Sequence, residues 1–130
     1  MAKSAQFLRC NALDALSMKE CGEYIENNFQ KLYVDTVNWP SLTVYQPICA
    51  VMGAYSDKYL YAHFVVRENG ILAENCKNLS PVANDSCVEF FLKTPTSDEY
   101  WNFEFNCIGA VNASHRVTRP GAIRLTDEEI

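Results

Sequence analysis

The chain has 130 residues, with 11 Lys and Arg against 16 Asp and Glu, so its formal charge at pH 7 is -5. Hydrophobic residues make up 48% of the chain, and it has only 5 Gly and 5 Pro, a composition typical of one packed globular domain rather than a disordered segment. The acidic balance, without a stripe of basic residues, argues against a nucleic acid partner.

Membrane insertion and secretion are not indicated by the hydropathy pattern. The longest wholly apolar run, 48–52, is far shorter than the roughly 20 residues that cross a bilayer. The first ten residues contain no apolar stretch of the kind found in secretory signals. We therefore expect no membrane partner and a cytoplasmic location, or a secreted one if a leader has been removed.

The cysteines do not form a metal or redox motif, because no two of the six stand in a C-x-x-C arrangement. We therefore expect no metal and no cofactor. Free thiols, mostly buried, are the favoured interpretation, and Cys87 and Cys107 lie within apolar strand patterns.

A helix is predicted near 18–27. Ser17 and Glu20 have the spacing of a capping box, and apolar residues follow at helical intervals. The next segment, 31–37, is a short extended candidate that precedes Trp39-Pro40.

The hydrophobic period then changes to two, which predicts strands. The first covers 43–55, and Pro47 indicates either an edge position or a strand that begins after it. The second covers 59–67, with the face of Leu60, Ala62, Phe64 and Val66 expected in the core. A brief strand at 71–73 and a loop at 75–84 follow.

Two further strands, 86–94 and 100–111, are joined by a turn-rich connection and predict an antiparallel hairpin. Alternation places Trp101, Phe103 and Phe105 on one face, so Trp101 is expected in the core. The other face carries Glu89 on the first strand and a polar row, Asn102, Glu104 and Asn106, on the second. A sheet that is apolar behind and polar in front is suited to holding a ligand.

The chain closes on Thr126-Asp127-Glu128-Glu129, a second capping-box pattern followed by a single residue. We expect a helix to start here and the chain to be an incomplete copy of its domain. Missing C-terminal strands would leave an exposed sheet edge through which two copies could associate.

The strand motifs resemble a known family. Trp39-Pro40, the run from Asp85 to Leu92 (DSCVEFFL) and the run from Tyr100 to Gly109 (YWNFEFNCIG) resemble the core strands of type 9 carbohydrate-binding modules, which belong to the DOMON-like β-sandwiches. The resemblance covers about 38–129. It implies a mostly β fold, an antiparallel sandwich of immunoglobulin-like or DOMON-like type with one N-terminal helix, forming a single domain over 1–130.

The same resemblance implies non-catalytic binding of a plant-type oligosaccharide or polysaccharide, in a module that accompanies a glycoside hydrolase. Glu89 and Asn106 match polar positions of the family's motif, and Glu104 stands where the family carries arginine. These three residues are the predicted carbohydrate contacts. The loop 80–84 contains no tryptophan, although the family's loop supplies a stacking tryptophan there.

Four alternatives stay open. Glu89 and Glu104 could be the paired carboxylates of a retaining glycosidase, or belong to an ordinary solvated sheet face. The chain could also be a scaffold that kept the fold and lost the sugar site. The last is a haem-binding electron-transfer domain that uses Met52 with His63, expected on a strand, or with His115, expected in a loop over 112–116.

Overall fold

The computed structural model describes residues 3–130. The chain forms two compact units, Met1–Asn69 and Gly70–Ile130, and each contains its own four-stranded sheet. The predicted fold class, mostly β with one N-terminal α-helix, is confirmed. Whether the two units act as the single predicted domain stays a prediction. None of the helices formed by residues 3–130 has the length and apolar character needed to cross a bilayer.

The first sheet is built around β3 (Ile48–Tyr55), which begins directly after Pro47. β4 (Leu60–Arg67) pairs antiparallel with β3 along its whole length. The other edge of β3 receives β2 (Leu32–Tyr33) antiparallel and β1 (Leu8–Arg9) parallel. The predicted extended segment 31–37 is therefore a strand over two residues only, and the brief strand predicted at 71–73 does not form.

The helix α1 (Met18–Asn28) starts at the predicted capping box. Ser17 Oγ accepts the backbone N–H of Glu20, and the Glu20 carboxylate accepts the backbone N–H of Ser17 at 2.9 Å. The Ser17 hydroxyl and backbone lower the pKa of Glu20 because both donate to its charged form. Two backbone donors that the helix leaves unpaired are thereby satisfied.

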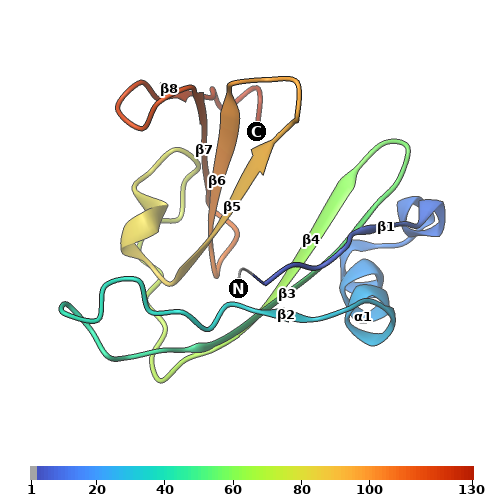
Figure 1. Cartoon of the computed structure of the whole chain (residues 1–130), viewed down its shortest axis with the longest axis horizontal. Coiled ribbons are helices and arrows are strands. Elements are labelled where there is room, and N and C mark those ends of the chain that lie inside the picture. The colour runs from blue at the N-terminus through green and yellow to red at the C-terminus, as the bar shows by residue number, and fades with distance from the viewer. Residues whose placement is uncertain (1–2) are drawn as a thin grey trace. The chain divides into compact units, whose positions relative to one another are not determined.

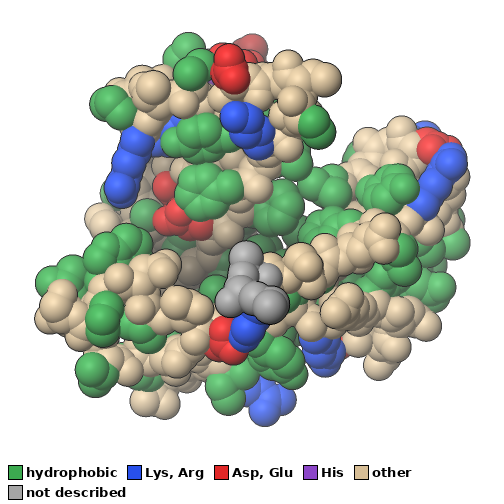
Figure 2. Space-filling model, viewed as in Figure 1, with side chains coloured by type: hydrophobic (Ala, Val, Ile, Leu, Met, Phe, Trp, Pro, Cys, Tyr) green, Lys and Arg blue, Asp and Glu red, His purple; other side chains and the backbone are tan. Residues whose placement is uncertain are grey.

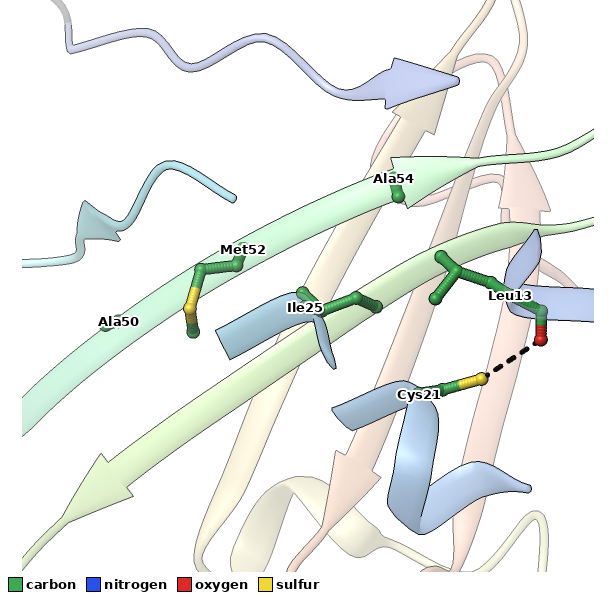
Figure 3. Close-up of a cluster of buried hydrophobic side chains, with 6 residues drawn as sticks. All are labelled: Leu13, Cys21, Ile25, Ala50, Met52 and Ala54. Atoms are coloured by element: carbon green, nitrogen blue, oxygen red, sulfur yellow. Dashed lines mark hydrogen bonds between the residues drawn. The ribbon is translucent and has the colours of Figure 1, made fainter. Parts of the chain in front are cut away.

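The core of this unit lies between α1, the 3-10 helix η1 (Asn11–Ala15) and β3, as Figure 3 shows. Its buried members come from all three elements: Leu13, Cys21, Ile25, Ala50, Met52 and Ala54. From β4, Tyr61 and Val65 pack against this cluster, whereas Leu60 and Val66 are exposed. The predicted core face of β4 is thus wrong for this cluster, because α1 covers the opposite side of the strand.

The second sheet has the order β5-β6-β7-β8 and is antiparallel throughout, as Figure 1 shows. The predicted hairpin is confirmed as β5 (Cys87–Lys93) and β6 (Tyr100–Asn106). β7 (Val111–Arg116) and β8 (Ile123–Arg124) complete the sheet. The 3-10 helix η2 (Val82–Asn84) packs against β5 and β6.

The predicted strand 100–111 is two strands joined by a turn. Gly109 has a φ of +89° there, a backbone conformation that glycine adopts without steric cost. Residues 112–116, expected as a loop containing His115, belong to β7 instead. Cys107 lies exposed in the turn rather than inside a strand.

At the C-terminal end of the chain, the second capping-box pattern forms a turn rather than a helix. The Glu129 carboxylate accepts the backbone N–H of Thr126 at 2.8 Å and its hydroxyl at 3.0 Å. Half of the capping box is therefore present, because the Glu129 N–H donates to the Thr126 carbonyl at 3.1 Å rather than to the Thr126 hydroxyl, and residues 127–130 are not helical.

Candidate functional site

The second sheet has one polar and one apolar face, and the register of its strands fixes which side chains share each. The register places these residues on one side, which we call the polar face: Cys87, Glu89, Phe91, Lys93, Tyr100, Asn102, Glu104, Asn106, Asn112, Ser114, Arg116 and Arg124. The opposite, apolar face carries Trp101 stacked between Phe103 and His115, with centroid distances of 6.3 and 4.9 Å. Trp101 is half-buried there, away from the predicted sugar contacts.

Glu89 and Glu104 are direct partners across the β5–β6 pair. Partners of this kind have Cβ atoms roughly 5 Å apart and project from the same face. Asn112, the next residue across on β7, donates from Nδ2 to Glu104 Oε2 at 2.7 Å. Arg124 Nη2 in turn donates to Asn112 Oδ1 at 2.8 Å. The structure therefore brings two predicted site residues together and holds one of them by a hydrogen-bonded chain.

The electrostatic setting of Glu89 opposes its ionisation. Partial desolvation on the sheet raises its pKa, and the nearby negative charge of Glu104 adds to this. Asn102 and the positive charges of Arg116 and Arg119 act in the opposite direction without cancelling the shift. A hydrogen-bond donor placed beside Glu89 would favour its charged form.

Asn106, the third predicted contact, is only 6% exposed, and its side chain is engaged within the protein. Its Nδ2 donates to Asp85 Oδ2 at 2.8 Å and to the carbonyl of Asn75 at 2.7 Å. Its Oδ1 accepts the backbone N–H of Ala110 at 2.8 Å. The structure thus places Asn106 at the end of the polar face, where it joins the turn to the preceding loop.

Asp85 organises that loop. Its carboxylate accepts the backbone N–H groups of Glu74 and Asn75, the Asn75 side-chain amide and the Asn106 amide. Burial alone would raise the pKa of Asp85, but these hydrogen bonds favour the charged form and lower it below its usual value. The loop that leads into η2 is thereby tied to the end of β6.

The sequence does not single out several members of the polar face as contacts, among them Asn102, expected only as part of a polar row, and Ser114 and Arg116, expected in a loop. Asn102 is 5% exposed, and its Nδ2 lies outside hydrogen-bonding geometry with any acceptor in residues 3–130. Arg116 donates to Ser114 Oγ and to the carbonyl of Arg119, while its Nε has no partner there. Extending the two-residue alternation through 111–116 could have found both β7 residues.

The residues considered for haem lie in different places. Met52 is fully buried in the core of the first unit, directly across from His63 on β4. His115 belongs to the second unit, where its Nδ1 lies 3.3 Å from the Glu99 carboxylate. Within residues 3–130, no group of three His, Cys, Asp or Glu side chains is arranged to hold a metal ion.

On the face drawn in Figure 2, the Lys and Arg side chains of the described residues are scattered among hydrophobic and uncharged groups. Several large hydrophobic side chains of the first unit are exposed, including Trp39 at 64%. Trp39 belongs to the irregular segment between β2 and β3.

The comparisons with known proteins agree with the sheet motifs. The model of carbohydrate-binding family 9 matches residues 21–129. The chain belongs to this family. The match extends the resemblance of the strand motifs to include most of α1, and it confirms the predicted family.

The chain is similar to a solved structure of a proposed carbohydrate-binding protein from Bacteroides uniformis. The TM-score is 0.75, the sequence identity is 25%, and the similarity covers 96% of this chain. The chain spans 59% of the length of that structure. No curated protein matches the chain in sequence.

Proposed function

We propose that the polar face of the second sheet binds a plant-type oligosaccharide or polysaccharide without catalysing a reaction, as a module linked to glycan breakdown. Membership of a carbohydrate-binding family supports sugar binding. The observation that carries the assignment to this face is the direct pairing of Glu89 with Glu104 in a sheet face rich in amides and guanidinium groups.

The chemistry of these groups suits sugar hydroxyls. Each carboxylate accepts hydrogen bonds only, and bonds to a charged acceptor are stronger than those between neutral groups. A sugar hydroxyl that donates to Glu89 would offset the cost of keeping that carboxylate partly desolvated beside Glu104. Because Asn112 already holds Glu104, that acceptor is positioned before a sugar arrives.

The arrangement favours binding over glycoside hydrolysis. A glycosidase places its two carboxyl groups on opposite sides of the scissile bond. Glu89 and Glu104 are cross-strand partners, so they project side by side from one surface and a sugar would lie above both of them. Asn106 stays a predicted contact, although its polar atoms serve the turn in the structure.

Calorimetric titration of the chain with cellotetraose, xylotetraose and mannotetraose tests the proposal. We expect one of these sugars to bind and Glu89→Gln to weaken that binding at least about tenfold, because a carboxylate acceptor becomes a weaker, neutral one. Glu128→Gln is the matched control, since Glu128 is exposed and lies off the sheet. Failure of all three sugars to bind would favour a scaffold that kept the fold and lost the site.

A further inference from the structure

We propose that the sugar ring stacks on Phe91, which is supported by Tyr100. A strand residue would then supply the aromatic surface that the preceding loop, residues 80–84, does not provide. This inference rests on the proposed function and specifies how that site is built. The ligand class is a neutral pyranose ring that presents its C–H face to Phe91 and its hydroxyls to the polar groups beside it.

Phe91 is placed at the polar face by the register of the sheet. It lies on the same strand as Glu89, two residues further along, so both side chains project from the same side. Phe91 is 57% exposed, unusually open for a phenylalanine within a sheet. The Tyr100 ring lies 6.2 Å from it, centroid to centroid, at an angle of 42°. Tyr100 thus limits the positions that the Phe91 ring can take.

The groups around Phe91 supply the polar half of a sugar site. Asn102 is the direct cross-strand partner of Phe91, and its buried amide interacts with the Glu89 carboxylate, although Nδ2 makes no hydrogen bond of full geometry among the described residues. Arg116 is the cross-strand partner of Tyr100, and its buried Nε also lacks one there. Both atoms are enclosed within the sheet, so they lie beneath the surface that a ligand would meet. Glu89 is the exposed polar side chain next to Phe91 on this strand, and its carboxylate can accept hydrogen bonds from sugar hydroxyls.

A sugar needs both kinds of surface at once. The C–H groups on one side of a pyranose pack against an aromatic ring, while its hydroxyls at the rim form directional hydrogen bonds. On β5 the two requirements meet within three residues, with Phe91 as the apolar surface and Glu89 as the acceptor. The loop residues 80–84 include no aromatic side chain that could take this role.

The experiment compares Phe91→Ala, Phe91→Trp and Tyr59→Ala with the unmodified chain, using whichever of cellotetraose, xylotetraose or mannotetraose binds it. Tyr59 is the matched control, because it is an aromatic residue of almost equal exposure, 59%, located in the other unit. Thermal melts of each variant establish that folding is retained. We expect Phe91→Ala to weaken binding at least about tenfold and Tyr59→Ala to leave it unchanged.

The tryptophan variant gives a direct reading of contact. If the sugar stacks at this position, Phe91→Trp should retain binding, and its added emission should shift or be quenched when the sugar is titrated in. The inference would be overturned if Phe91→Ala bound the sugar with unchanged affinity, or if the emission of the introduced tryptophan did not change when the sugar bound. The proposed function would not be affected by either result. If the unmodified chain binds none of the three sugars, both the proposed function and this inference are wrong.

Discussion

Asn106 offers the sharpest test of how the polar face is built. Replacing it with alanine removes three hydrogen bonds made by a side chain that is 6% exposed. A hydrogen bond contributes about 1 kcal/mol net, and a buried donor left without a partner costs about 1 to 3 kcal/mol. The backbone N–H of Ala110 would be such a donor. We therefore expect Asn106→Ala to reduce the free energy of unfolding by about 3 to 5 kcal/mol.

Urea denaturation followed by circular dichroism measures this loss. With a slope of about 2 kcal/mol per molar urea, the midpoint should fall by about 1.5 to 2.5 M. Asn27→Ala is the control, because Asn27 is exposed on α1 and its side-chain amide donates to the carbonyl of Glu23, one turn earlier in the same helix. Alanine favours a helix, so this change should alter stability by less than about 0.5 kcal/mol. If both variants unfold at the same midpoint, Asn106 does not hold the turn as argued.

Three other outcomes follow from particular contacts. Ser17→Ala should reduce stability by about 1 kcal/mol because the N-terminus of α1 loses its cap, and an unchanged thermal midpoint would contradict this. Leu13→Ala should cost about 3 to 5 kcal/mol in urea denaturation, since Leu13 is 1% exposed, whereas Leu42→Ala, at 82% exposure, should cost less than about 0.5 kcal/mol. Folding raises the Glu89 pKa, so ionisation of this group destabilises the folded chain. The resulting loss of stability grows as the pH rises from the unfolded-state pKa to the folded-state pKa. Glu89→Gln should therefore be more stable than the unmodified chain at pH 7, and should lose that advantage in melts below the unfolded-state pKa of Glu89, near 4.5. An equal advantage at both pH values would show that folding does not raise the Glu89 pKa.

Features that depend on residues close together in the chain could be predicted from the sequence. The cap of α1 consists of Ser17 and Glu20, which are three positions apart in the sequence. At this spacing, the first turn of a helix brings each side chain to the backbone N–H of the other residue. Likewise, alternation along β5 and β6 placed Glu89 and Glu104 on one face, because successive side chains of a strand must point to opposite sides. The family could also be recognised from these strand motifs.

Which surfaces are covered, and which polar groups are already hydrogen-bonded, depends on contacts between residues that are distant in the sequence. Alternation divides the side chains of β4 into two sets but does not indicate which set α1 will cover. In the structure, Tyr61 and Val65 pack against the core cluster that includes α1. The polar character of Asn106 suggested a ligand contact, yet its partner Asp85 lies 21 residues away in sequence. A side chain's hydrogen-bonding capacity is consumed by whichever groups folding brings to it, and those groups come from distant parts of the chain.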